Sequence, residues 1–220
     1  MNNTGETTPR LTEFYLEYRK QHHDIRCLLE KTSQYYSESA LIRLTRAKCA
    51  DTRRAAALLL GFLGTYESNE PLGLLLKDSD RSVRLLAENS LKSVWTRDGS
   101  EEHRRELHAV MRHIAGQDYG EAVRRANILL DDYPLFAEAV NQRAIALFAL
   151  KNFRDAIDDG QFVLELNPYH FGAAVGTGHA YWQLGDKMPA VESFQRALFI
   201  NPNLDGIRRH LECLTGTRTR

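Results

Sequence analysis

Hydrophobic residues recur at helical spacing through the C-terminal half of the chain, and prolines interrupt this pattern at a fixed interval. Pro134, Pro168 and Pro202 follow one another at steps of 34 residues. A proline cannot continue a helix, and it biases the residue before it away from the helical conformation. Other residues keep the same interval: Ala122, Ala156 and Ala190, and the turn residues Asp118, Asn152 and Asp186. The pattern predicts three antiparallel helix pairs, one ending at each proline.

These units resemble tetratricopeptide repeats (TPR). The third unit carries the largest share of the motif, with Gly178, Tyr181, Ala190, Phe194, Ala197 and Pro202 in place. The first two units keep the alanine and the proline, but Val110 and Ala144 replace the motif glycine, and Ala126 and Gly160 replace the aromatic. The resemblance covers about residues 103–202. It implies a right-handed solenoid in which the first helix of each pair lines a concave surface.

Beyond Pro202 the apolar residues again fall on one helical stripe. They predict a helix over residues 204–214 that covers the last apolar face of the array: Leu204, Ile207, Leu211 and Leu214.

Upstream the chain repeats at a step of 31 residues. Four positions illustrate it, since Leu41, Arg53, Ala56 and Leu60 map onto Leu72, Arg84, Ala87 and Leu91. The segment LKDSDRSVRLLAENSLKSVW resembles a HEAT repeat, and the resemblance covers about residues 39–95. A single helix is predicted before it, at about residues 11–31.

The expected fold is therefore all-α, an alpha-alpha superhelix in which HEAT-like pairs precede three TPR units and a C-terminal capping helix. Its expected parts are a disordered tail at residues 1–10, HEAT-like repeats at 11–97, and a TPR domain with its capping helix at 98–220.

Composition narrows the classes of partner. Lys+Arg and Asp+Glu number 29 each, so no bulk charge steers the chain toward nucleic acid or an acidic membrane. Cys27, Cys49 and Cys213 form no C-x-x-C motif, which favours a reducing compartment. The N-terminal residues lack a signal-peptide pattern, and the longest apolar run is too short to span a bilayer. A cytoplasmic protein is expected.

Candidate chemistry is sparse. His103, His108 and His113 are five residues apart, so they point in different directions on a helix and cannot share one metal ion. The segment GTGHAY at 176–181 lies within a predicted helix and does not meet the context of a phosphate loop. An enzyme, as among HEAT-like bilin lyases, would need a polar cleft that the sequence does not assemble. We expect no catalytic activity, no metal and no cofactor.

One basic cluster leaves a nucleic-acid alternative open. It consists of Arg43, Arg46, Lys48, Arg53 and Arg54, opposed by Asp51. Phosphate binding needs clustered cations. However, the resemblance implies that Arg53 braces the turn of its repeat, and no aromatic residues are interleaved for base stacking. A solvated and partly structural face is favoured.

The remaining candidate is the concave surface that the TPR resemblance implies. Its residues form a groove with apolar and a few polar side chains, suited to an extended or helical peptide: Leu107, Asn141 and Val175; Met111, Ile145 and His179; Ile114, Phe148 and Trp182; and His108 and Gln142 alongside. Ile114 and Phe148 could instead pack between helices, and Trp182 is the candidate anchor. TPR proteins that clamp a chaperone's C-terminal carboxylate use Lys, Asn and Arg in this groove. Here those positions hold Leu107, Met111, Gln142, Gly172 and Gly176, so no clamp is expected. The predicted function is a non-catalytic module that binds another protein.

Overall fold

The computed structural model describes residues 9–20 and 24–216, and all regular secondary structure in these residues is helical. The expected all-α class of helical-repeat solenoid is confirmed. Of the tail predicted at residues 1–10, the first eight residues lie outside the described part, and Arg10 already begins a helix. None of the helices in the described part combines the length and apolar character needed to cross a membrane.

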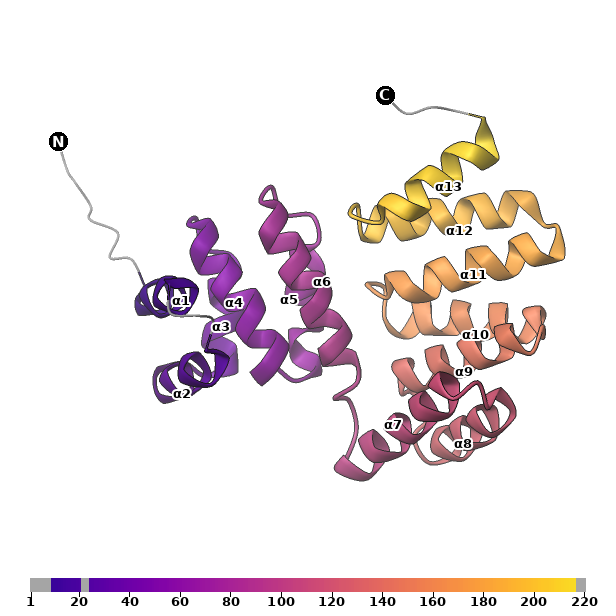
Figure 1. Cartoon of the computed structure of the whole chain (residues 1–220), viewed down its shortest axis with the longest axis horizontal. Coiled ribbons are helices and arrows are strands. Elements are labelled where there is room, and N and C mark those ends of the chain that lie inside the picture. The colour runs from indigo at the N-terminus through magenta and orange to yellow at the C-terminus, as the bar shows by residue number, and fades with distance from the viewer. Residues whose placement is uncertain (1–8, 21–23, 217–220) are drawn as a thin grey trace. The chain divides into compact units, whose positions relative to one another are not determined.

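The chain forms two compact units, residues 1–94 and 95–220. The division falls three residues before the boundary that was predicted after residue 97. Each unit consists of short helices (Figure 1) and is described by itself.

Within residues 9–20 and 24–94 the structure describes six α-helices and one 3-10 helix in the N-terminal unit: α1 (Arg10–Lys20), α2 (Ile25–Tyr35), α3 (Glu38–Leu44), α4 (Ala50–Leu63), η1 (Tyr66–Ser68), α5 (Asn69–Leu75) and α6 (Arg81–Trp95, whose last residue belongs to the second unit). The single helix predicted at 11–31 is wrong, because α1 ends at Lys20 and α2 begins at Ile25. Asp24 starts the second helix as its N-cap, and its side chain accepts hydrogen bonds from the backbone N–H groups of Arg26 and Cys27.

Helix α4 is the centre of this unit. It packs against α1 and α3, and Ala56, Leu59 and Leu60 are fully buried. It also approaches α6 closely, because a side chain at Gly61 would collide with Ser90. The Ser90 hydroxyl donates a hydrogen bond of 2.8 Å to the carbonyl O of Ala57.

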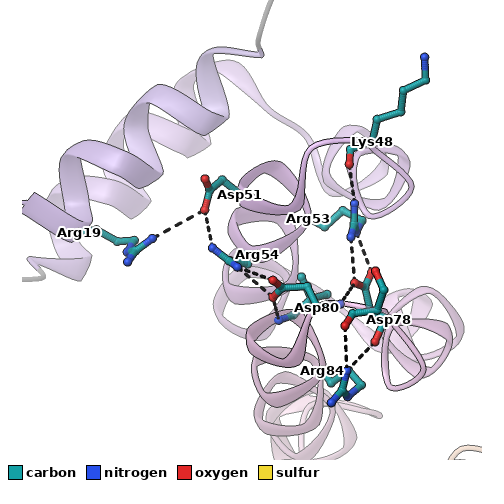
Figure 2. Close-up of polar contacts among 10 residues, drawn as sticks. Arg19, Lys48, Asp51, Arg53, Arg54, Asp78, Asp80 and Arg84 are labelled. Carbon is teal, nitrogen blue, oxygen red and sulfur yellow. Dashed lines mark hydrogen bonds and ion pairs between the residues drawn. The ribbon is translucent and has the colours of Figure 1, made fainter.

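Arg53 holds together two turns of this unit, as Figure 2 shows. Its Nη1 donates to the carbonyl O atoms of Ala47 and Lys48, both at 2.8 Å. Its Nε and Nη2 donate to the two carboxylate oxygens of Asp78 at 2.7 and 2.9 Å. The side chains of Arg53 and Asp78 are only 14% and 8% exposed, so this is a largely buried, two-pronged ion pair.

The same brace recurs one 31-residue step later. Arg84 donates through Nη1 to the carbonyl O atoms of Asp78 and Ser79, at 2.8 and 3.2 Å. These acceptors stand at the same sequence distance from Arg84 as Ala47 and Lys48 do from Arg53. The contacts support the 31-residue repeat, and the assignment of that repeat to the HEAT class stays a prediction.

The neighbouring arginine of the basic cluster is also paired. Arg54 forms an ion pair with Asp80, which it contacts through both Nε and Nη2, and its Nη1 lies 2.8 Å from Asp51. The Arg54 guanidinium lowers the pKa of Asp80 to about 2. Two of the five cationic side chains in the predicted basic cluster therefore serve the packing of the unit.

The described part of the C-terminal unit, up to residue 216, contains seven further helices, which follow one another in the order of the chain (Figure 1): α7 (Glu101–Ala115), α8 (Tyr119–Asp132), α9 (Ala137–Ala149), α10 (Phe153–Leu166), α11 (Phe171–Leu184), α12 (Lys187–Ile200) and α13 (Asp205–Thr215). The pairs α7/α8, α9/α10 and α11/α12 are the first, second and third repeats. They match the three predicted helix pairs, and Pro134, Pro168 and Pro202 lie in the connections that follow them.

The first helices of the three repeats lie next to one another, since α9 contacts both α7 and α11. We call the surface of these three helices the first-helix face. Helix α13 packs on α12 and caps the array as predicted. Its apolar residues Ile207, Leu211 and Leu214 are half-buried.

Replacing Arg53 tests the brace. Arg53→Ala should lower the free energy of unfolding by about 3 kcal/mol or more, because it leaves the buried Asp78 carboxylate without its partner. Arg43 is exposed on α3, so Arg43→Ala should change the stability by no more than about 0.5 kcal/mol. Urea denaturation of the full chain, followed by circular dichroism, measures both. Equal, small effects would contradict a structural role for Arg53.

Candidate functional site

A cavity of about 380 Å³ opens on the first-helix face in the second and third repeats. Helices α9, α10 and α11 all contribute to its walls. We call it the central cavity, and its lining is apolar apart from Asn141, Thr177 and His179: Asn141, Ala144, Ile145, Phe148, Ala156, Gly160, Gly172, Ala173, Gly176, Thr177 and His179.

At the crossing of its two helices the second repeat pairs two small residues, whereas the third repeat pairs a glycine with a phenylalanine and the first a valine with an alanine. In the third repeat the ring of Phe194 is fully buried against Gly178, and a Cβ atom at Gly178 would lie 2.6 Å from that ring. The equivalent positions of the second repeat are Gly160 and Ala144, which both line the cavity. In the first repeat the equivalent positions are Val110 and Ala126. Both are buried in one core cluster with Ala122 and Ala146. In the second repeat the Thr177 hydroxyl of α11 stands next to Gly160, 2.2 Å from the position of a Cβ atom there, and the cavity lies beside it.

Four of the predicted groove residues come together at the cavity. Asn141, Ile145 and Phe148 line it from α9, and His179 lines it from α11. Ile145 is 43% exposed, which is high for a large aliphatic side chain on a helix face. These four residues were predicted from the repeat alignment, whereas the glycines that make the cavity open were not recognised as part of it.

The predicted residues on α7 lie outside the cavity. Leu107 is 0% exposed, so it belongs to the core, contrary to its expected place in the groove. Ile114 packs against the core cluster of the first repeat, which was the alternative considered for it. His108 is exposed and Met111 is half-buried. Repeat alignment identifies the side of a helix that faces the groove, but the depth of each side chain depends on its neighbours.

The remaining predicted residues flank the cavity on α9 and α11. Val175 is half-buried, and Gln142 donates a 2.6 Å hydrogen bond to Glu138. The ring of Trp182 lies edge-on to His210 of α13, with centroids 6.1 Å apart. Trp182 thus contacts the capping helix, and its role as a partner anchor stays a prediction.

A buried polar network orients Asn141. Glu138 is only 6% exposed, and its Oε1 accepts hydrogen bonds from Asn141 and Gln142 at 3.3 and 2.6 Å. Its other oxygen, Oε2, lies 3.0 Å from Nε2 of His170. A buried carboxylate with these three partners is well satisfied, so the network is a fixed polar boundary of the site.

A hydrogen bond to the backbone determines which ring nitrogen of His170 carries the proton. Nδ1 of His170 accepts a hydrogen bond from the backbone N–H of Ala173, as the N-cap of α11. Nε2 must then carry the proton and donate it to Glu138. The indole of Trp95, the first residue of this unit, stacks on the imidazole at 4.0 Å. Nothing in the sequence pattern marked Glu138 and His170 as partners, because 32 residues separate them.

His179 belongs both to the cavity and to the packing of the capping helix. Its ring lies edge-on to Phe194, with centroids 5.0 Å apart, and 5.6 Å from the ring of His210 on α13. Burial, together with the smaller effect of His210, lowers the pKa of His179 below its ordinary value. Near neutral pH the cavity is therefore lined by an uncharged imidazole.

Among the described residues, no group of three or more His, Cys, Asp or Glu side chains is arranged to hold a metal ion. His22 and His23 lie outside those residues.

No protein-family model matches the chain. The human protein DnaJ homolog subfamily C member 7 is 34% identical over 86 residues, which cover 39% of this chain and 17% of that protein. A TPR repeat-containing protein of Rhizobium etli is 31% identical over 90 residues, which cover 39% of this chain and 44% of that protein. The matches thus span less than half of the length of either relative.

A solved structure shares the fold of the C-terminal unit. The first TPR domain of Spaghetti (RPAP3), bound to the HSP90 peptide SRMEEVD, is similar with a TM-score of 0.51 and 23% identity, over 54% of this chain and 94% of that one. With its 34-residue helix pairs, the C-terminal unit has the fold of a tetratricopeptide-repeat (TPR) domain.

The lowered pKa of His179 makes the stability of this domain depend on pH. The unfolded histidine titrates near 6.5, so below that pH the unfolded chain binds a proton that the folded chain resists. The free energy of unfolding should fall as the pH drops through about 6.5, and the fall should end below the folded pKa. His179→Gln should weaken this dependence between about pH 7.5 and 5.5, whereas His108→Gln on the exposed face of α7 should not.

Urea denaturation at several pH values would measure how the free energy of unfolding depends on pH. An unchanged pH dependence in His179→Gln would mean that other groups titrate in this range.

Proposed function

We propose that this protein is a non-catalytic adaptor that binds a peptide segment of another protein on the first-helix face of its TPR domain. The observation that carries the proposal is the central cavity, because four of the predicted groove residues meet there. A concave, mostly apolar pocket with a few polar groups at its edge is the usual form of a binding site. The cytoplasmic location expected from the cysteine spacing is part of the same proposal.

The class of partner follows from the geometry of the face. A peptide that lies across α7, α9 and α11 can place a side chain in the cavity and run its backbone past Asn141 and Gln142. The TPR domain of RPAP3 holds an HSP90 peptide. A peptide ligand is therefore a reasonable expectation for this domain as well.

A C-terminal carboxylate is not the proposed ligand. Cationic side chains are absent from the clamp positions, which hold Leu107, Met111, Gln142, Gly172 and Gly176. The carboxylate of Glu138, which is hydrogen-bonded to the cavity residue Asn141, would repel another carboxylate. Internal segments of a partner suit this face better than a free C-terminus.

The nucleic-acid alternative has less support. Arg53 and Arg54 are engaged with Asp78 and Asp80, so they contribute little to an electrostatic surface for phosphates.

Gly176 offers a direct test, because it lines the cavity and a Cβ atom built there meets nothing within 4 Å. Gly176→Leu should narrow the cavity without loss of stability, since leucine favours a helix over glycine by roughly 0.8 kcal/mol. Gly120→Leu is the matched control, because Gly120 is an exposed position of α8 that is equally open.

The measurement uses peptides selected from a random library on the immobilised full chain. Their affinity for Gly176→Leu should fall at least about tenfold, while Gly120→Leu should bind them as the wild type does. Equal binding by all three proteins would place the peptide site elsewhere.

A further inference from the structure

We propose that the central cavity takes one aromatic side chain of the bound peptide. This inference rests on the proposed function and specifies its ligand.

The third repeat shows that this helix crossing can hold an aromatic ring. There Phe194 extends from the second helix of the pair, and its ring lies against Gly178 of the first helix. In the second repeat Gly160 and Ala144 stand at the equivalent positions and line the cavity. The hydroxyl of Thr177 on α11 lies 2.2 Å from the position that a Cβ atom would take at Gly160, so Thr177 fills the space directly at Gly160 and the cavity lies beside it.

The side walls are suited to an aromatic ring. Phe148 is held on one side by Phe153, with ring centroids 5.3 Å apart and an edge-to-face angle of 62°. His179 is held on the other side by Phe194, at 5.0 Å and 71°. Phe148 and His179 both line the cavity. Aromatic rings prefer edge-to-face or offset contacts with other rings, so a ring that enters meets two immobilised partners.

Charge selects a neutral occupant. No lysine, arginine, aspartate or glutamate lines the cavity. The polar atoms that do line it are largely engaged: Asn141 donates to Glu138, and the Thr177 hydroxyl donates to the carbonyl O of Ala173 at 2.9 Å. A charged side chain would lose its hydration here without gaining a partner.

Access and size favour a single flat group. Gly172 and Gly176 are exposed on α11 and place no side chain across the opening. The volume of about 380 Å³ lies within the range for ligand pockets, roughly 300–1,000 Å³, and is large enough for a Phe, Tyr or Trp side chain.

The test uses the full chain and peptides selected on it from a random library. The selected peptides should share one Phe, Tyr or Trp, and its replacement by Ala should weaken binding about thirtyfold. In the protein, Ala144→Phe should fill the cavity from within and abolish binding of these peptides. Gly120→Phe, at an exposed and open position of α8 outside the first-helix face, is the control and should leave binding unchanged. Circular dichroism checks that both variants fold.

The outcomes separate this inference from the proposed function. Peptides that bind, are weakened by Gly176→Leu and share no aromatic residue would overturn the inference and leave the proposed function in place. Failure to select any peptide would count against both. Concentration-dependent dimerisation that Ala144→Phe abolishes would assign the cavity to a second copy of this chain and would also overturn the inference. If Ala144→Phe does not fold, the alanine replacement in the peptide decides.

Discussion

The packing of the TPR domain depends on the volume of the side chains at the point where the two helices of each pair cross. A helix pair can close only if one side offers a small residue, and the third repeat does so with Gly178 beneath the Phe194 ring. Interiors are normally packed to the density of organic crystals, so a repeat with two small residues at this crossing is an exception. The second repeat, with Ala144 and Gly160, is that exception. It can persist because each repeat of a solenoid is supported by its neighbours on both sides.

This constraint explains which parts of the structure could be predicted from sequence. The 34-residue step identified the helix pairs and the connections at Pro134, Pro168 and Pro202, because backbone geometry repeats whenever the turn residues do. Four of the residues that the step selected line one cavity: Asn141, Ile145, Phe148 and His179. The step could not predict how deeply each side chain is buried, because burial depends on the facing helix. Leu107 was placed in the groove for this reason, whereas the structure shows it in the core. The aligned repeats show that Gly160 stands where the motif has an aromatic residue. Whether a cavity results depends on the surrounding side chains, so it could be recognised only in the structure.

Local chemistry accounts for the other differences. The break between α1 and α2 depends on one side chain, Asp24, whose carboxylate satisfies two backbone N–H groups at the start of α2. Helical periodicity of the apolar residues continues across that break, so periodicity alone joins the two helices. For Arg53 the repeat resemblance did predict the local structure. It implied that Arg53 braces the turn of its repeat, whereas a count of charges alone would have treated Arg53 as an exposed cation. Guanidinium groups that bind carbonyl oxygens and buried carboxylates stabilise the packing, and they contribute little to the charge of the surface.

His179 lies between the central cavity and the end of the array. Its imidazole lines the cavity and also contacts Phe194 and His210, so the same side chain borders the proposed ligand site and takes part in the packing of α13. An occupant of the kind we propose would remove water from this ring and disfavour its protonated form further. By linkage, protonation of His179 would then weaken the binding of that occupant by the same factor by which the occupant resists protonation. Under the proposed function, ligand affinity and attachment of the capping helix would share one titrating group, because His179 stands at the boundary between the two.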